Sequence, residues 1–162
     1  NLFSFKKDQR IFCNRGTSGI DGSTSTAIGA ALTSNQPGLL ITGDLSFFYD
    51  SNGLWNDYIP NDFKIILINN SGGGIFRILP GEKEKAYYER YFETTHQLLA
   101  EDLCKMYGFD YQFTEDEKNV NEKLTHLFNN NTRPQLLEIK TPRSVNDEVL
   151  LGYFSFLAEK CF

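Results

Sequence analysis

Residues 63–74 read Phe-Lys-Ile-Ile-Leu-Ile-Asn-Asn-Ser-Gly-Gly-Gly, a β-branched apolar run that ends in two amides and a glycine-rich segment. The run from Phe63 to Asn69 lacks the apolar–polar alternation of a half-exposed strand, so it predicts a strand covered on both faces. Strands of this kind are typical of parallel sheets with helices on either side. The glycines after it predict a loop at the carboxyl end of the strand. This stretch therefore indicates an α/β fold.

The rest of the chain alternates in the same way. Three further apolar runs predict buried strands, at Arg10–Asn14, Leu39–Thr42 and Gln135–Lys140. Helical spacing of apolar residues predicts helices at Ser23–Leu32, Asn52–Ile59, Thr95–Tyr107, Asn119–Phe128 and Asp147–Lys160. Alternation of this kind predicts an open, mostly parallel sheet flanked by helices, in one domain. In such sheets ligands bind beyond the carboxyl ends of the strands.

Composition limits the possible partners. The 162 residues are 40% hydrophobic and 23% charged, a globular balance that excludes a disordered or fibrous chain. Sixteen Lys and Arg against 21 Asp and Glu give a net charge of −5, which argues against a nucleic-acid or membrane-surface binder. A local site for an anion remains compatible with that charge, and no apolar run is long enough to span a membrane.

Cysteine usage and the first residues bear on location and length. The three cysteines are far apart and form no CxxC pair, so reduced thiols and a cytoplasmic location are expected. Residues 1–10 contain no apolar segment of the kind found in signal peptides. The sole methionine is Met106, so we expect the 162 residues to be a piece of a longer polypeptide.

Two polar residues follow predicted strands, and together they suggest a metal site. Asp44 comes after the Leu39–Thr42 strand and Asn70 after the Phe63–Asn69 strand, 26 positions apart. If the two strands are neighbours, a carboxylate and an amide meet at one edge of the sheet. Mg²⁺ prefers about six oxygen ligands and usually keeps phosphate and water among them. Taken singly, Asp44 could cap a turn and the amides could support a turn; as a pair they favour a metal that holds a diphosphate.

The glycine-rich segment Gly16–Gly22 is less informative by itself. Its GxxGxxG spacing matches neither the dinucleotide fingerprint GxGxxG nor the P-loop GxxxxGK[ST]. Small residues before a helix could hold a phosphate on backbone N–H groups, but for this segment alone an ordinary strand-to-helix turn is the favoured interpretation.

Residues 14–81 contain three segments, NRGTSGIDGSTSTAIGAA, GDLSFFYDSNGLW and INNSGGGIFRILPG, which resemble a known family. The pair Gly43-Asp44 followed by Asn69-Asn70 is similar to the thiamine-diphosphate motif, with Leu45 in place of the usual small residue. The three segments together resemble the C-terminal, diphosphate-binding (PP-type) domain of the 2-succinyl-5-enolpyruvyl-6-hydroxy-3-cyclohexene-1-carboxylate synthases of menaquinone biosynthesis. After Gly81 only the α/β pattern matches.

That resemblance implies an activity and a set of site residues. The family decarboxylates 2-oxoglutarate on thiamine diphosphate, adds the resulting succinic semialdehyde unit to isochorismate and releases CO2. The implied ligands of Mg²⁺ (or Mn²⁺) are the side chains of Asp44 and Asn70 and the backbone carbonyl of Gly72. The residues implied to contact the cofactor are Ser18, Gly19, Ile20, Gly43, Leu45 and Ser46. The residues implied to face substrate are Arg15, Ile75 and Phe76, and a guanidinium at Arg15 suits a carboxylate.

The resemblance also implies a division of labour. In this family the acid that activates the cofactor lies in a separate pyrimidine-binding domain, so no catalytic residue is assigned within the 162 residues. They are expected to form the single C-terminal domain of a multidomain homodimer or homotetramer. Two alternatives stay open: another thiamine-diphosphate 2-oxoacid decarboxylase or carboligase, such as acetohydroxyacid synthase, and a non-catalytic nucleotide-binding module. NRG followed by GIDG and GGGIF favours the synthase.

Overall fold

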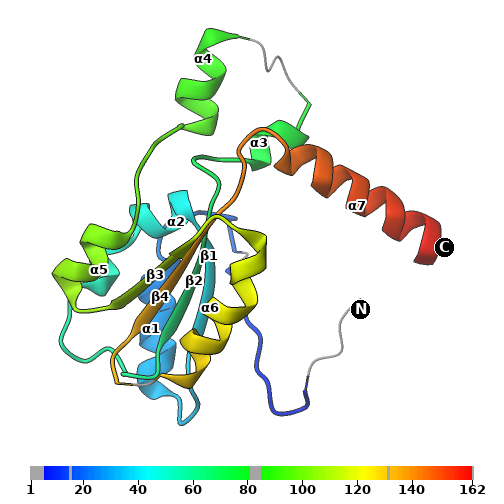
Figure 1. The fold of residues 1–162 in the computed structure, drawn as a ribbon. Helices are drawn as coiled ribbons and strands as arrows, with labels where there is room; N and C mark the ends of the chain where they lie inside the picture. Colours follow the sequence, from blue (N-terminus) through cyan, green and yellow to red (C-terminus); the bar gives the residue numbers. More distant parts are fainter. Residues whose placement is uncertain (1–5, 15, 81–84, 131, 162) are drawn as a thin grey trace.

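The computed structural model describes residues 6–14, 16–80, 85–130 and 132–161. Its centre is a four-stranded parallel sheet in the order β1-β2-β4-β3 (Figure 1). The strands are β1 (Leu39–Gly43), β2 (Lys64–Asn69), β3 (Asp110–Thr114) and β4 (Gln135–Lys140). The predicted open parallel α/β sheet is therefore confirmed.

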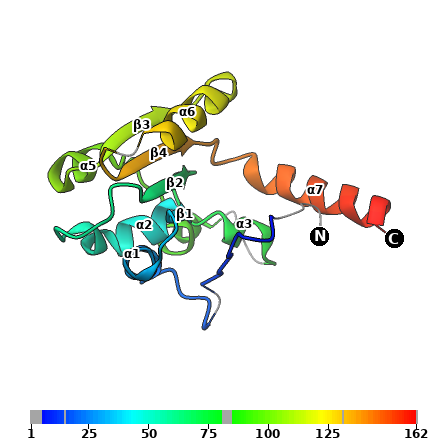
Figure 2. The same cartoon turned by 90° about the horizontal axis from the view of Figure 1, so that it is seen from below.

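Helices cover both faces of this sheet. Figure 2 shows α6 on one side of the sheet and α1 with α2 on the other. The helical elements are α1 (Ser23–Thr33), α2 (Asp44–Tyr49), the 3-10 turn η1 (Ser51–Leu54), α3 (Ile75–Ile78), α4 (Ala86–Tyr88), the π-helical η2 (Glu89–Glu93), α5 (Glu101–Tyr107), α6 (Glu117–Asn129) and α7 (Asn146–Cys161).

Alternation along the central strands divides the core into two clusters. Ile65 and Leu67 of β2 pack with residues of α1, α2 and α5 on one face. Ile66 points to the opposite face and packs with Leu127 of α6 and with Leu137 of β4. Because successive side chains of a strand point to opposite faces, a continuous apolar run is what a doubly covered strand requires.

Three predicted helices are confirmed to within two residues at each end, and a fourth is confirmed in part. The three helices confirmed at both ends are Ser23–Leu32, Asn119–Phe128 and Asp147–Lys160, which correspond to α1, α6 and α7. The predicted helix Thr95–Tyr107 ends at Gly108, whose φ of 76° is left-handed as a C-terminal glycine allows, but it begins only at Glu101. The residues before α5 instead bond to the end of β2: His96 N–H donates to the Ser71 carbonyl at 3.3 Å.

Two predicted elements are wrong. Arg10–Asn14 is an exposed segment outside the sheet without regular secondary structure, with Phe12 84% exposed, because an apolar run favours a strand but does not supply a second strand to pair with. Asn52–Ile59 contains only the 3-10 turn η1, closed by a hydrogen bond from Trp55 N–H to the Asn52 carbonyl. Strand β3 was not predicted, although Asp110–Thr114 alternates polar with aromatic residues, which is the pattern of a partly covered strand.

The last helix lies apart from the sheet. Figures 1 and 2 show α7 leaving the body of the molecule beside α3, and it carries many exposed apolar side chains. They are Val149, Leu150, Leu151, Tyr153, Phe154 and Phe156. Over the ranges that the structure describes, α7 included, no helix is long and apolar enough to cross a membrane.

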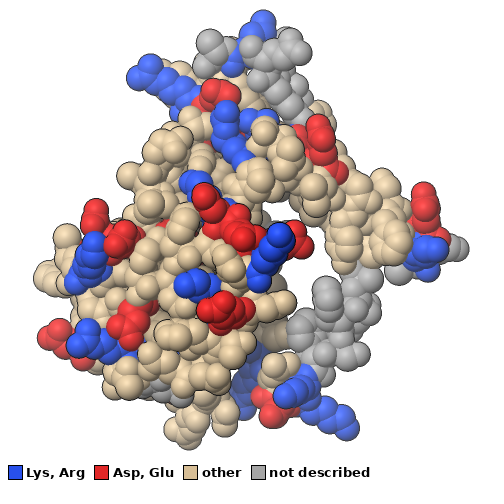
Figure 3. Space-filling model, viewed as in Figure 1, with Lys and Arg blue, Asp and Glu red and all other residues tan. Residues whose placement is uncertain are grey.

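Charged side chains are spread over the surface that Figure 3 presents. Lysine and arginine alternate with aspartate and glutamate across this face, while most of α7 carries neither (Figure 3). On the described part of this face, no continuous basic stripe of the kind that tracks a nucleic-acid backbone is visible.

Two of the cysteines, Cys13 and Cys104, are expected to differ sharply in reactivity. Both are free thiols, Cys13 exposed and Cys104 fully buried between α5 and the sheet. Burial, helped by the charges of Glu138 and Glu101, raises the pKa of Cys104 to about 12. At pH 8 such a thiol is ionised in only about one molecule in 10⁴, and the thiolate is the reactive form.

Iodoacetamide should therefore modify Cys13 in the native chain and Cys104 only after unfolding in urea, as peptide mass spectrometry would show. Equal native labelling of the two would contradict the buried position of Cys104.

Candidate functional site

The carboxyl ends of β1, β2 and β4 bring the predicted metal-site residues to one edge of the sheet. Strand β1 pairs with β2 so that Gly43 lies opposite Ile68, and β2 pairs with β4 so that Asn69 lies opposite Lys140. Asp44, the first residue of α2, therefore faces the loop that follows β2. The condition on which the sequence argument depended, that the two strands are neighbours, is met.

Asp44 is buried and bound to that loop. Its side chain is enclosed, with the residue 2% exposed, and Oδ2 accepts a hydrogen bond from Gly72 N–H at 2.9 Å. Oδ1 accepts from Leu45 N–H at 2.7 Å. Two carboxylate oxygens offer about four acceptor positions, so the carboxylate keeps capacity for a cation.

His96 is a site residue that the spacing of the sequence did not reveal. Its Nε2 lies 3.2 Å from Oδ2 of Asp44, and its ring meets Phe48 edge to face at 5.5 Å. Nδ1 accepts a hydrogen bond from Leu98 N–H at 3.1 Å, so the neutral imidazole carries its proton on Nε2, toward Asp44. A lone histidine 52 residues from Asp44 gives no local signal; only the return of the chain from η2 brings it here.

The two adjacent amides have different roles. Asn69 is fully buried and all its hydrogen-bonding groups are used: Nδ2 donates to Leu98 and Glu138, and Oδ1 accepts from Ser71 and Lys140. Asn70 is half-buried, and its Nδ2 lies 2.6 Å from where a Cβ on Gly74 would stand. A side chain at position 74 would therefore press on the end of the Asn70 side chain. The amide oxygen of Asn70 stays the predicted metal ligand, whereas the amide of Asn69 is fully engaged.

The loop that follows Asn70 has an unusual backbone. Ser71 has a left-handed φ of 64° and Gly72 a φ of 151°. A Cβ on Gly72 would lie 2.7 Å from the Glu93 carbonyl oxygen, which also accepts a hydrogen bond from Gly73 N–H at 2.7 Å. Position 72 therefore requires glycine, because the loop is pressed against the end of η2.

Glu93 anchors this contact from the other side. It is buried, and its carboxylate pairs with Arg77 of α3 and with Arg143, whose Nη1 lies 3.0 Å from Oε2. Arg143 also reaches Glu89 at 3.1 Å. Two guanidiniums and the loop backbone thus converge on one residue. It joins α3, η2 and the segment before α7 at the edge of the sheet where the site lies.

The glycine-rich segment before α1 reaches the same site through Ser46. Ser46 Oγ donates to the Ile20 carbonyl at 2.5 Å, so Ser23 Oγ must donate to Ser46 Oγ, at 2.8 Å. Asn14 Nδ2 in turn donates to Ser23 Oγ at 3.4 Å. This chain of hydrogen bonds brings Asn14, Ile20 and Ser23 against the first turn of α2, next to Asp44.

The other predicted cofactor contacts lie around this junction. Ser18 is exposed with a left-handed φ of 59°, Gly19 is also exposed, and Ile20 is 45% exposed. Gly43 precedes Asp44 as the N-cap of α2. The structure thus brings Ile20 and Ser46 together, while Arg15 lies outside the described residues.

An apolar wall borders the loop. A Cβ added to Gly73 would lie 3.4 Å from the Leu45 side chain and 3.3 Å from the Phe76 side chain, so these two side chains flank the loop. Phe76 packs edge to face on Phe92 at 5.7 Å, and Ile75 is 58% exposed. The predicted substrate-facing pair therefore projects from α3 beside the loop, with Phe76 anchored and Ile75 open to solvent.

The donor set fits a hard divalent cation that shares its ligands with a diphosphate. It consists of the carboxylate of Asp44, the amide oxygen of Asn70 and the carbonyl of Gly72, all of them oxygens. Within the described ranges no group of three His, Cys, Asp or Glu residues is arranged to hold a metal by itself. Two protein side chains and one carbonyl leave positions for phosphate oxygens and water.

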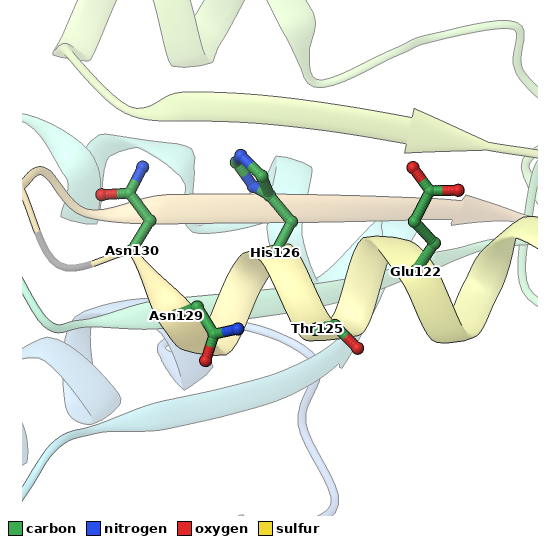
Figure 4. Close-up of a pocket in the computed structure, with 5 residues that line it drawn as sticks. All are labelled: Glu122, Thr125, His126, Asn129 and Asn130. Atoms are coloured by element: carbon green, nitrogen blue, oxygen red, sulfur yellow. The ribbon is translucent and has the colours of Figure 1, made fainter.

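A second concave region carries no comparable chemistry. An open depression along α6 is lined by Glu122, Thr125, His126, Asn129 and Asn130 (Figure 4). Glu122 and His126 extend from the helix on one side and Thr125 on the other (Figure 4). It lies on the face of the sheet covered by α6, and none of the predicted site residues lines it.

Comparison with known proteins assigns the chain to a family. The chain belongs to the thiamine pyrophosphate enzymes, whose C-terminal TPP binding domain matches residues 1–139. The solved structure of a thiamine diphosphate-dependent 4-hydroxybenzoylformate decarboxylase of Rhodococcus jostii RHA1 has the same fold, with a TM-score of 0.56 at 21% identity. That match covers 72% of this chain and 22% of the decarboxylase.

Curated relatives narrow the class further. The chain is 56% identical over 156 residues to the 2-succinyl-5-enolpyruvyl-6-hydroxy-3-cyclohexene-1-carboxylate synthase of Christiangramia forsetii, covering 96% of this chain and 27% of that protein. It is 60% identical to the synthase of Flavobacterium psychrophilum, again over 96% of the chain and 28% of the relative. The chain thus spans about a quarter of the length of these relatives. The resemblance drawn from residues 14–81 is confirmed and extends over nearly the whole chain.

Proposed function

We propose that this chain is the cofactor-binding domain of a thiamine-diphosphate-dependent 2-succinyl-5-enolpyruvyl-6-hydroxy-3-cyclohexene-1-carboxylate synthase in menaquinone biosynthesis. The substrates are 2-oxoglutarate and isochorismate, and the products are the named carboxylate and CO2. The observation that carries this proposal is the convergence of Asp44, Asn70 and Gly72 at one edge of the sheet, in a chain up to 60% identical to such synthases.

The residues around Asp44 would hold the cofactor through its diphosphate. Asp44, Asn70 and Gly72 would bind Mg²⁺ or Mn²⁺, which neutralises the phosphates. Ser18, Gly19, Ile20, Gly43, Leu45 and Ser46 would line the cofactor, Ser46 already being joined to Ile20 by a hydrogen bond. When bound, thiamine diphosphate supplies the electron sink for decarboxylation and carbon–carbon bond formation.

The remaining predicted residues would act on the substrates and on water. Phe76, held by Phe92, and Leu45 would form a dry wall beside the reacting carbons, which strengthens electrostatic contacts there. Ile75 extends that wall. Arg15 would pair with a substrate carboxylate through its planar guanidinium.

The proposal also covers the other domains and the subunits of the enzyme. The chain would be the C-terminal domain of a longer enzyme in the cytoplasm, and the acid that activates the cofactor would come from a pyrimidine-binding domain of a partner subunit. A homodimer or homotetramer would then be the active form. Here "full-length protein" means the polypeptide with all the domains its gene encodes.

The proposal is tested with the purified full-length protein, thiamine diphosphate and Mg²⁺. With 2-oxoglutarate and isochorismate together, mass spectrometry should detect the synthase product and an equal amount of CO2. Release of CO2 and free succinic semialdehyde with no product from isochorismate would point instead to a 2-oxoacid decarboxylase. Absence of both the synthase product and CO2 release would reject the synthase and the 2-oxoacid decarboxylase alike.

Substrate recognition is tested at Arg15. A charge-assisted pair of this kind contributes about 1.5–3 kcal/mol, so Arg15→Ala should lower kcat/KM by roughly ten- to a hundredfold. Arg15→Lys should recover part of the loss, because an ammonium cannot reproduce the two-pronged geometry. Steady-state kinetics for each substrate and a cofactor titration measure the two effects. Loss of cofactor affinity with unchanged KM values would instead assign Arg15 to the diphosphate.

A further inference from the structure

A fully buried carboxylate lies directly beneath the candidate site. Glu138 stands in the middle of β4, on the sheet face that Leu136 and Leu67 otherwise make apolar. Its Oε1 accepts a hydrogen bond from Asn69 Nδ2 at 2.5 Å. Its Oε2 accepts from Ala100 N–H at 2.9 Å and from the Tyr111 hydroxyl at 2.7 Å. A buried charge is costly unless it is fully hydrogen-bonded, and here both oxygens are.

The partners of Glu138 belong to the two segments that enclose Asp44. Asn69 immediately precedes Asn70, and its Nδ2 also donates to the Leu98 carbonyl at 2.9 Å. Ala100 ends the segment that carries His96 and Leu98. Glu138 therefore connects the end of β2 to the segment before α5, and its hydrogen-bond partners Asn69, Ala100 and Tyr111 are not among the residues assigned to metal or cofactor.

Lys140 binds Ser71, in the loop after β2. It ends β4 opposite Asn69, and its Nζ donates to Ser71 Oγ at 2.6 Å and to Asn69 Oδ1 at 3.3 Å. Ser71 N–H donates to Asn69 Oδ1 at 3.0 Å. The left-handed φ of Ser71 is uncommon for a residue other than glycine, so it persists only where neighbouring groups hold it.

We propose that Glu138 and Lys140 are positioning residues that hold the loop of Ser71 in the conformation that presents Asn70 and Gly72 to the metal. Glu138 acts through Asn69, and Lys140 acts through Ser71, which lies between the two ligands. This inference rests on the proposed function. The inference adds to the proposed metal site a layer of polar contacts from β4 that determines metal affinity.

The test measures metal binding directly in the full-length protein. Mn²⁺ affinity is followed by electron paramagnetic resonance at saturating thiamine diphosphate, and turnover is measured as a function of Mg²⁺ concentration. Lys140→Met is expected to weaken Mn²⁺ binding at least about tenfold, in the range found when outer partners of metal ligands are removed. Turnover should return toward the unmodified level at high Mg²⁺. Lys140→Arg, which keeps a cationic donor, should restore part of the affinity. Glu138→Gln should weaken binding in the same direction, because an amide cannot accept all three hydrogen bonds.

Two further variants separate positioning from general stability. Lys64→Met removes a buried lysine, whose Nζ donates to the Asn130 carbonyl at 2.7 Å at the opposite end of β2; Lys140 itself is half-buried. It should lower Tm without changing Mn²⁺ affinity. Ser71→Ala removes the acceptor of the Lys140 hydrogen bond. If the two residues act through that bond, the double variant Ser71→Ala with Lys140→Met should bind Mn²⁺ about as tightly as whichever single variant has the lower Mn²⁺ affinity. Ser71→Ala also tests the contact if Lys140→Met fails to fold.

The possible outcomes distinguish this inference from the proposed function. Mn²⁺ binding unchanged in Lys140→Met or, if that variant does not fold, in Ser71→Ala would overturn the positioning role and leave the function standing. Additive losses in the double variant, or an equal loss in Lys64→Met, would also overturn it. An unmodified protein that binds no Mn²⁺ with thiamine diphosphate would refute the proposed function and this inference with it.

Discussion

Replacing Asp44 by alanine in the full-length protein is expected to lower cofactor-dependent turnover by more than about a hundredfold. Asp44 is the buried carboxylate of the proposed metal site, and loss of even an outer partner of a metal ligand costs about ten- to a hundredfold. Without it, the metal has the neutral Asn70 and Gly72 oxygens left in this chain. Turnover at millimolar Mg²⁺ and the rise of Tm on adding thiamine diphosphate with Mg²⁺ measure the effect, and both should be nearly lost.

Asp50→Ala is the matched control. Asp50 is also buried, six residues further along at the end of α2, and it accepts hydrogen bonds from Ser25 N–H at 2.7 Å and Ser25 Oγ at 2.6 Å. It should lower stability by about 1–3 kcal/mol while the cofactor still raises Tm. Near-normal turnover in Asp44→Ala, or loss of the cofactor effect in both variants, would reject Asp44 as a metal ligand.

Gly72→Ala is expected to destabilise the chain itself by roughly 2 kcal/mol or more. A φ of 151° is reached readily only by glycine, and the new Cβ would lie 2.7 Å from the backbone oxygen of Glu93. A backbone oxygen cannot rotate away as a side chain can, so the loop must shift away from η2. The urea midpoint of unfolding, followed by circular dichroism, measures this cost.

Gly29→Ala provides a control of opposite sign. Gly29 lies in α1, is exposed, and a Cβ there would meet nothing within 4 Å. Alanine at this position should raise stability by about 0.5–1 kcal/mol, because glycine is a poor helix former. If Gly72→Ala unfolds at the urea concentration of the unmodified chain, the close approach of the loop to Glu93 is not a constraint on the fold.

Several features of this protein were predictable because their causes are local. The run Phe63–Asn69 has the pattern of a strand covered on both faces, and β2 begins within one residue of that prediction. Gly108 ends α5 in the left-handed conformation that a glycine after a helix predicts. Asp44 and Asn70 follow apolar runs directly, so a parallel sheet was enough to expect them at one edge.

Other features depend on contacts between distant segments. The sequence separates Asn69 from Asn70 only by position, as the last residue of a strand and the first after it; the structure adds that Glu138 and Lys140, about 70 residues later, engage the side chain of Asn69. His96 reaches Asp44 only because the chain returns past Ser71 after η2. The apolar run Arg10–Asn14 failed as a strand for the same reason, since pairing is a property of two segments.

The sequence by itself determined the fold class, the glycines at strand ends and the resemblance carried by residues 14–81, because hydrophobic periodicity, turn chemistry and motif spacing are written along the chain. Only the tertiary structure decided which residues support the site. Asn69, Glu138 and Glu93 are ordinary polar residues in sequence, and burial beside the loop of Ser71 is what forces each of them to find a partner there. The half-buried Lys140 joins them through its hydrogen bond to Ser71.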